Sequence, residues 1–232
     1  MRQYISLIVL VLIISCNNQN HSDQLRVQQF EENLGKEKSK ALTKKVEFFE
    51  KFLSENYENS TVEESYEKFL LEIQSSGWDF DNWKFDSLLL DSMNNICEIS
   101  GLREEIWLRR DSVWFEGDHL CYYYQYINEE DTFESANFFR TDSGITHFGM
   151  RPLYERNLNR DSILEIEKTV ITFNINGKFV KALEKVQDSD STIINYVDAK
   201  LSAGNISPSL FASGFLYAEP DYSDYFIKRI IH

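Results

Sequence analysis

The amino-acid sequence predicts an α+β fold with amino-terminal helices, a central antiparallel meander and carboxy-terminal helices. Two observations support this fold class. Apolar residues recur at intervals of three and four from residue 39 to about residue 100, and again beyond Pro152, as in amphipathic helices. Between these parts, residues 106 to 149 are rich in aromatic and β-branched side chains, which favour strands. We therefore expect a sheet between helical layers.

Two amphipathic helices are expected first. One extends from residue 39 to about residue 57, where apolar positions at helical spacing face away from Lys and Glu. The second begins at Ser60 or Thr61, because a glutamate three places later completes a capping box in either case, and Gly77 closes it. The buried stripes of the two helices are expected to contain Leu42, Val46, Phe49 and Leu53, and Val62, Tyr66, Phe69, Leu70 and Ile73.

A third helix is expected to open at Asp81 or Asn82 and to end at Ser100-Gly101. The antiparallel meander follows from about residue 106 to residue 149. It is interrupted by Glu116-Gly117-Asp118 and by the polar residues 128–131, which are typical of turns. The third helix is expected to direct inward Phe85, Leu89, Met93, Ile96 and Cys97.

Helical spacing returns beyond Pro152, with residues 160–162 as a cap and an apolar stripe that reaches Phe173. Two interpretations stay open around Asn176-Gly177. The length of the stripe favours two helices joined there, whereas an Asn-Gly pair is typical of a type I′ hairpin. Further helices are expected after the capping segment Asp188-Ser189-Asp190 and from Ser207-Pro208, and the tail from Tyr222 to Ile231 is compatible with a last strand. The stripe after the capping segment contains Ile193, Ile194, Val197 and Leu201.

The first fifteen residues have the composition of a secretory signal peptide. They contain one cation, Arg2, no acidic residue, and an apolar run from Ile5 to Ile14 that only Ser6 interrupts. A membrane-spanning helix needs about 20 apolar residues, and this run is roughly half that length. We therefore expect the segment to be removed on export.

The apolar run ends in Ile13-Ile14-Ser15-Cys16, which resembles the lipobox of bacterial lipoproteins. The resemblance covers this segment alone, and Ile13 replaces the more usual leucine. It implies that a diacylglycerol group is attached to the Cys16 thiol and that cleavage makes Cys16 the first residue. This covalent lipid is the only cofactor-like group expected. The alternative is an ordinary cleaved signal on a free periplasmic protein.

Three parts are expected: a signal peptide over residues 1–15, a lipidated flexible tether over 16–36, and a single α+β domain over 37–232. The tether is predicted because its residues are mostly polar. The net charge of −14 disfavours nucleic acid as a partner, since an acidic protein repels polyphosphate. The expected partners are a membrane, contacted through the lipid, and an envelope protein or glycan.

Candidate metal ligands and a candidate disulfide lie in the central region. His119 and Cys121 share one face of a predicted strand, and His147 from a neighbouring strand would supply a third metal ligand. Ordinary packing of these residues is the alternative. In an oxidising compartment Cys97 and Cys121 are able to form one disulfide. Their apolar sequence neighbours favour two buried free thiols instead.

A run of alternating rings and carboxylates, Trp78, Asp79, Asp81 and Trp83, has the composition of a carbohydrate-binding surface. Helix capping by the two aspartates explains the same residues. No common catalytic motif occurs in the sequence, so the catalytic residues of an enzyme stay unassigned. The leading hypothesis is a lipid-tethered, non-enzymatic binding or accessory module of the cell envelope. The alternatives are a carboxylate-dependent hydrolase of envelope or extracellular glycans, and an inhibitor or immunity-type lipoprotein.

Overall fold

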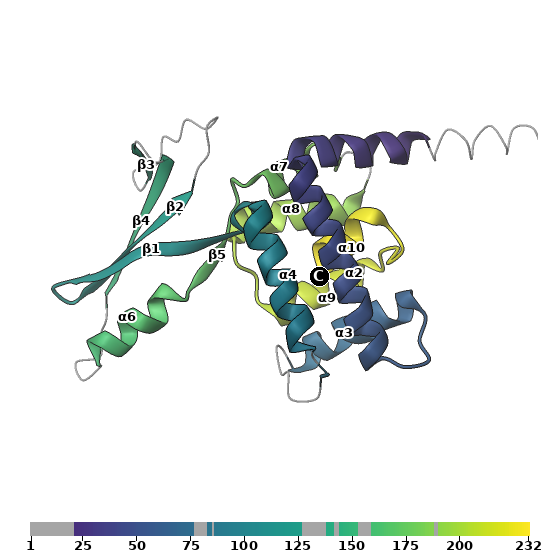
Figure 1. Ribbon diagram of the computed structural model, residues 1–232, viewed down its shortest axis with the longest axis horizontal. Helices are drawn as coiled ribbons and strands as arrows, with labels where there is room; N and C mark the ends of the chain where they lie inside the picture. The colour runs from purple at the N-terminus through teal and green to yellow at the C-terminus, as the bar shows by residue number, and fades with distance from the viewer. Residues whose placement is uncertain are drawn as a thin grey trace, which may run out of the picture.

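The structure is a computed structural model that describes residues 21–76, 83–84, 86–126, 138–141, 144–152, 159–187 and 190–232. The predicted α+β class is confirmed, with more helix than strand among these residues. Figure 1 shows a twisted sheet to one side of a helical body, and the chain crosses between them at the start of β1 and at β5. The elements are α2 Lys36–Asn56, α3 Val62–Ser76, α4 Ser87–Ser100, α5 Leu102–Ile106, β1 Trp107–Glu116, β2 His119–Tyr126, β3 Phe138–Thr141, β4 Gly144–Pro152, α6 Arg160–Lys168, β5 Ile171–Phe173, α7 Lys178–Glu184, α8 Ser191–Ala203, α9 Pro208–Ala218 and α10 Tyr225–Ile231.

Residues 21–34 form a helix ahead of α2, whereas their polar composition predicted a flexible tether. Phe30 and Leu34, four residues apart on one face, are almost completely buried. The Phe30 ring meets the Phe226 ring edge to face, with the ring centres 5.6 Å apart. Arg26 lies over the same Phe226 ring at 5.0 Å. Two apolar residues at helical spacing are thus enough to dock this segment on the domain, while its polar residues face solvent.

The capping box predicted for the second helix is confirmed at Thr61. The Thr61 N–H donates to Glu64 Oε2 at 2.9 Å, and the Glu64 N–H donates to Thr61 Oγ1 at 3.2 Å. Val62, which was expected to be buried, is instead 44% exposed. It occupies the first helical position, before the buried stripe begins.

Replacing Thr61 with alanine is expected to lower the free energy of unfolding by about 1 kcal/mol, because the cap at the start of α3 is lost. Denaturant unfolding of the two proteins measures the difference. Ser60→Ala is the matched control, since Ser60 Oγ only accepts a bond from the exposed Lys68 ammonium at 2.7 Å. Equal losses in the two variants would contradict the assignment of the cap.

Helix α4 begins at Ser87, later than the predicted start, and ends at Ser100 with Gly101 as its C-cap, as predicted. The Asp86 carboxylate is the N-cap and accepts from the backbone N–H groups of Leu88 and Leu89 at 3.1 and 3.2 Å. Gly101 adopts a φ of +70°, the left-handed conformation that closes many helices. Several Asp and Asn residues precede α4, and composition alone did not distinguish which of them is the cap.

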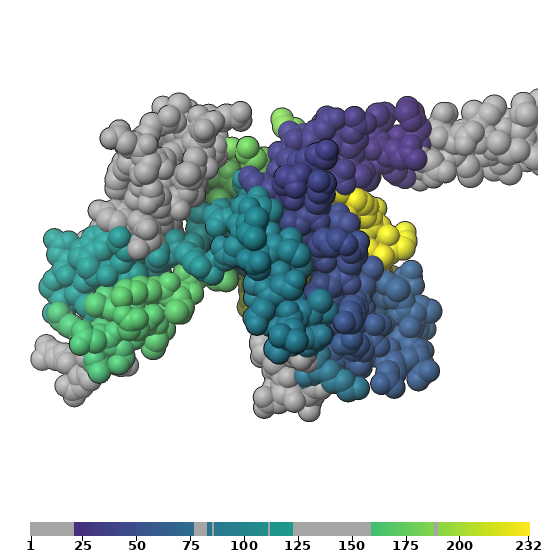
Figure 2. All heavy atoms as spheres, viewed as in Figure 1, coloured from purple at the N-terminus to yellow at the C-terminus, as the bar shows by residue number. Residues whose placement is uncertain are grey.

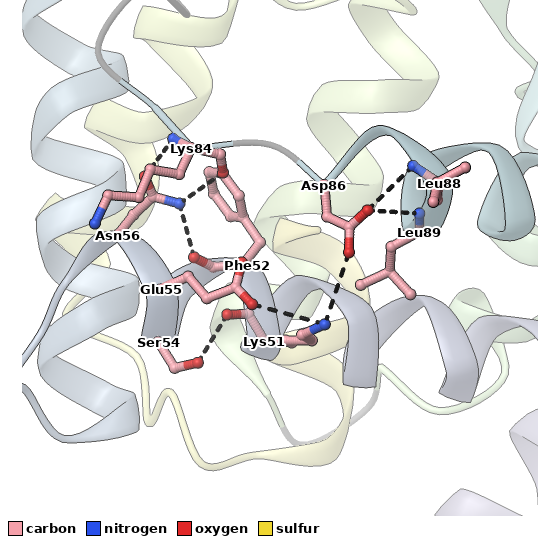
Figure 3. A network of polar contacts seen from close by, with 9 residues as sticks. All are labelled: Lys51, Phe52, Ser54, Glu55, Asn56, Lys84, Asp86, Leu88 and Leu89. Atoms are coloured by element: carbon pink, nitrogen blue, oxygen red, sulfur yellow. Dashed lines mark hydrogen bonds and ion pairs between the residues drawn. The ribbon is translucent and has the colours of Figure 1, made fainter.

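Polar contacts join the end of α2 to the segment before α4, as Figure 3 shows. Lys51 Nζ lies 3.6 Å from Glu55 Oε1 and 4.0 Å from Asp86 Oδ2. The Asn56 amide holds the backbone of Lys84 from both sides, accepting from its N–H at 2.7 Å and donating to its carbonyl at 3.1 Å. The amino end of α4 is thereby positioned against the carboxyl end of α2.

The sheet is antiparallel and has the strand order β3-β4-β2-β1-β5. The predicted break at residues 116–118 is confirmed, because Glu116 pairs with His119 across a turn at Gly117 and Asp118. The order departs from that of a sequential meander in two respects, the first being that β5 lies at the edge beside β1. The second is that β4, and not β3, lies beside β2, and β3 lies beyond β4.

Helix α6 is held against β1 by a buried ion pair between Arg110 and Glu167, whose side chains are 8% and 10% exposed. The Arg110 guanidinium also lies over the Tyr122 ring of β2, 3.7 Å from its centre. Breaking a buried pair leaves an uncompensated charge, so this contact favours one position of α6. Figure 2 shows an open space between α6 and α4.

The region around Asn176-Gly177 combines parts of both interpretations. Residues 171–173, expected to continue a helix, form the edge strand β5 paired with residues 107–109 of β1. The helix α7 then follows Gly177, as the two-helix interpretation predicted. A strand of three residues is too short to show alternation in the sequence, and pairing with β1 outweighs the helical spacing.

The predicted last strand is wrong, because the carboxyl end forms the helix α10. The Asp224 carboxylate caps it, accepting from the backbone N–H groups of Phe226 and Ile227 at 2.7 and 3.0 Å.

Among the described helices, none is long and apolar enough to cross a bilayer. The main core lies in the helical body, and its largest fully buried side chains include Tyr66, Phe30, Phe226, Leu34, Leu42 and Leu53.

Candidate functional site

A pocket of about 180 Å³ lies in the helical body, partly open to solvent. Helices α2, α3, α5, α7, α8, α9 and α10 contribute to it, together with the start of β1 and the end of β5. Its walls are mostly apolar. Its basic side chains are Lys45, Lys200, Arg229 and His232, and none of the described lining residues is an aspartate or a glutamate. The aromatic residues of the lining are Phe69, Trp107, Phe173, Phe179, Tyr196 and Phe211.

Lys200 of α8 is the most unusual of the basic groups, because it is only 6% exposed. Its ammonium nitrogen lies 4.3 Å from the centre of the Phe173 ring, and 5.8 and 5.9 Å from the rings of Tyr196 and Trp107. Burial lowers the pKa of Lys200 to about 8, so the charged form still prevails at pH 7. Cation–π contacts with the rings offset part of the cost of burying this charge.

Arg229 of α10 is also buried, and its hydrogen bonds within the described part of the chain are with neutral groups. It donates to the Tyr225 carbonyl at 3.0 Å and to Thr43 Oγ1 at 2.9 Å, and it lies 3.3 Å from the centre of the Tyr225 ring. Its Nε–H is buried and has no acceptor in the described part of the chain. The Glu31 carboxylate accepts from the Tyr225 hydroxyl at 2.7 Å. Its charge raises the pKa of Arg229 without forming an ion pair with it.

His232 and Lys45 complete the basic side of the pocket. The ring Nδ1 of His232 lies 3.0 Å from the Lys228 carbonyl, which is an acceptor, so Nδ1 is the donor of this bond. Burial, and then the charges of Lys45 and Arg229, lower the pKa of His232 well below its usual range. The imidazole is therefore neutral at pH 7, and its buried Nε2 is an acceptor without a partner among the described residues.

The charged groups of the pocket are basic, whereas the chain as a whole is acidic, with 38 acidic and 24 basic residues. Burial also lowers the pKa of Lys45, and no described carboxylate forms an ion pair with Lys45, Lys200 or Arg229. Cations surrounded by apolar groups interact with an anion much more strongly than cations in water do. The arrangement is therefore suited to binding an anionic group attached to an apolar body.

Sequence reasoning did not find this pocket, although one signal was present. The apolar stripe of α8 was assigned to Ile193, Val197 and Leu201, but Leu201 is 41% exposed and Lys200 takes the inward position. A lysine seven residues after Ile193 lies on the same helical face, so it interrupts the stripe at a core position. The basic groups come from α2, α8 and α10, and their convergence depends on packing that no local pattern shows.

The structure does not bring the predicted metal ligands together. The register pairs His147 with Tyr124, five residues along β2 from His119, which pairs with Pro152. Five residues of a strand span roughly 16 Å, too far for side chains to share one ion. His119 is exposed, whereas Cys121 is fully buried. In the part of the chain that the structure describes, no group of three or more His, Cys, Asp or Glu side chains forms a metal site.

Cys97 and Cys121 are free, buried cysteines, which agrees with the alternative to the disulfide. Cys97 lies on α4 and Cys121 on β2. Burial is the main cause that raises the pKa of each thiol, so both are protonated and poorly nucleophilic at neutral pH. Cys16 falls outside the described residues, and its lipidation stays a prediction.

Trp83 is a packed side chain at the edge of the helical core. Its ring centre lies 5.7 Å from that of Phe52 and 5.4 Å from that of Phe69, and its indole N–H donates to the Glu72 carboxylate. These contacts favour packing for this residue. The other members of the proposed binding run lie outside the described residues; they are Trp78, Asp79 and Asp81.

Comparisons of the chain with protein-family models, with curated proteins and with solved structures found no match.

Proposed function

We propose that this chain is an exported binding protein, held on a membrane of the bacterial cell envelope by a lipid on Cys16. The envelope location rests on the sequence Ile13-Ile14-Ser15-Cys16 at the end of a short apolar run. The observation that supports binding is the pocket, where apolar walls surround three basic side chains without ion-pair partners among the described residues: Lys45, Lys200 and Arg229. A non-enzymatic binding module accounts for both features.

The hydrolase hypothesis requires two carboxylates roughly 5 to 10 Å apart on either side of a bound glycan. The described lining of the pocket supplies basic groups and rings instead. Repulsion between such basic groups and a developing oxocarbenium ion would disfavour glycosidase chemistry at this site. Binding is therefore the function that the pocket supports better.

The anchor is tested by replacing Cys16 with alanine in the full chain. The unchanged protein is expected to incorporate labelled fatty acid in a bacterial host and to enter the detergent phase on phase separation, because each buried methylene contributes about 0.8 kcal/mol to membrane binding. The variant is expected to lose both properties. Cys97→Ala is the matched control and retains both, since Cys97 lies inside the folded domain. An unlabelled, water-soluble product of the unchanged gene would contradict the anchor.

A further inference from the structure

We infer, on the basis of the proposed binding function, that the pocket takes a small organic carboxylate whose apolar part is about the size of a benzene ring. Lys200 is the residue that contacts the carboxylate, and the surrounding rings contact the apolar part. A metal cation or a sugar fits these walls less well, because the described lining contains lysine and arginine but no aspartate or glutamate, and most of the other side chains are apolar.

The charge of the ligand follows from the hydrogen-bonding state of the basic groups. An ammonium group has three donors, and the contacts of Lys200 in the described structure are with the faces of aromatic rings. A carboxylate supplies acceptors and a negative charge in the same place. Arg229 adds a positive charge and Lys45 a further basic group, and no aspartate or glutamate is among the described lining residues. A carboxylate would therefore supply the acceptors and the negative charge that the Lys200 ammonium lacks among its described contacts.

The size of the ligand follows from the volume of the pocket. It is about 180 Å³, and an apolar cavity of about 150 Å³ accommodates benzene. A single ring or a short branched chain bearing one carboxylate fills such a space. A long fatty acid exceeds it, and a small inorganic anion leaves the apolar walls uncovered.

The orientation of the ligand follows from the distribution of polar and apolar groups. Phe173, Tyr196 and Trp107 surround the Lys200 ammonium, so a ligand whose carboxylate reaches Lys200 has its apolar part close to these rings. Phe69 and Phe211 lie on α3 and α9 and extend the apolar wall. An aromatic ring packs against such walls with favourable edge-to-face geometry.

The test is titration calorimetry of the full-length protein in detergent at pH 7, with a detergent-only reference. The probes are benzoate, its neutral counterpart benzyl alcohol, and acetate, which has the charge without the apolar body. Benzoate is expected to bind about tenfold more tightly than benzyl alcohol, because a hydrogen bond to a charged group discriminates by at least this factor. Acetate is expected to bind more weakly than benzoate, by a factor of about ten or more.

Lys200→Met is expected to abolish the preference for benzoate over benzyl alcohol while keeping the apolar walls. Lys44→Met is the matched control, because Lys44 is an exposed lysine on α2 that pairs with Glu47, and it retains the preference. Circular dichroism verifies the fold of both variants. Equal binding of benzoate and benzyl alcohol, or an unchanged preference in Lys200→Met, would overturn the carboxylate inference but leave a binding pocket. Absence of binding by all three probes would remove the proposed binding function of the pocket as well.

Discussion

Replacing Gly177 with alanine is expected to lower the free energy of unfolding by about 3 kcal/mol, because the added methyl group has no space. A Cβ at Gly177 would lie 2.0 Å from the backbone carbonyl oxygen of Glu105 and 2.8 Å from its carbon. The φ of Gly177 is −70°, which every residue adopts, so the cost comes from contact and not from backbone strain. A backbone atom is also less able to move away than the end of a side chain.

The junction around Gly177 is fixed by several polar contacts. Asn174, which is almost fully buried, donates from its backbone to the Ile106 carbonyl at 2.8 Å and from its side chain to the Glu104 carbonyl at 2.7 Å. The Lys178 N–H donates to Glu105 Oε2 at 2.6 Å. Separating α7 from α5 to admit a methyl group would weaken these bonds together, so the loss is expected near the upper end for an overpacked site.

Denaturant unfolding of Gly177→Ala and of the unchanged protein measures this loss. Gly214→Ala is the matched control, since a Cβ there meets nothing within 4 Å and the residue lies inside α9. Alanine is the better helix former, so the control is expected to gain roughly 0.5 to 1 kcal/mol. A Gly177→Ala loss below about 1 kcal/mol would show that the α5–α7 contact is looser than the structure indicates.

The parts of the fold that the sequence predicted well are those that local patterns determine. The stripe of α2 contains Leu42 and Leu53, both buried, and the cap of α3 is recognisable from Thr61 and a glutamate three places later. Gly101 marks the end of α4 because a left-handed residue is required there. Each signal involves residues within one or two helical turns, so no knowledge of the tertiary structure is needed.

The parts that were missed depend on partners far away in the chain. Phe30 looks isolated in a polar segment, yet it packs against Phe226 of α10, nearly the whole domain length away. Residues 171–173 become a strand because β1 offers a free edge among the described strands. The tail after Tyr222 is rich in aromatic and β-branched residues, which favour strands, but the Asp224 cap and burial against the helical body make it a helix. Tertiary packing thus overrides local propensity at each of these places.

The candidate site was the least predictable part for the same reason. Lys45, Lys200 and Arg229 look like ordinary surface cations in a chain rich in charge. Only the packing of α2, α8 and α10 makes them neighbours of one apolar pocket. Among the candidate metal ligands, the strand register places His147 opposite Tyr124, five residues along β2 from His119. Residue type suggested the metal site, whereas burial of charge identified the pocket.

Lys200→Met is expected to raise the free energy of unfolding by about 2 kcal/mol at pH 7. Burial lowers the pKa of Lys200 from 10.5 to about 8, a difference that corresponds to about 3 kcal/mol of cost for holding the charge in the folded state. Cation–π contacts offset about 1 kcal/mol of this cost of burying the charge. Methionine has a similar shape and no charge, so it fills the same space between the rings without that cost.

The stability that Lys200→Met gains over the unchanged protein is expected to decrease as the pH rises. Below pH 8 lysine is charged in both the folded and the unfolded chain, and the full cost of its burial is present. Between pH 8 and 10.5 the unfolded chain keeps the proton while the folded chain releases it, so the stability of the unchanged protein rises with pH. The advantage of Lys200→Met therefore shrinks across this interval. Unfolding of both proteins at pH 7 and at pH 9.5 measures this change.

If the free energies of unfolding of Lys200→Met and the unchanged protein differ by the same amount at pH 7 and at pH 9.5, the assigned cost of the buried charge is contradicted. If the variant is more stable and also loses its preference for benzoate, one residue accounts for both effects. A charge that destabilises the empty protein while it strengthens binding is expected at a ligand site, because the ligand supplies the missing partner. Saturating benzoate is then expected to stabilise the unchanged protein more than Lys200→Met, which narrows the difference in stability between them.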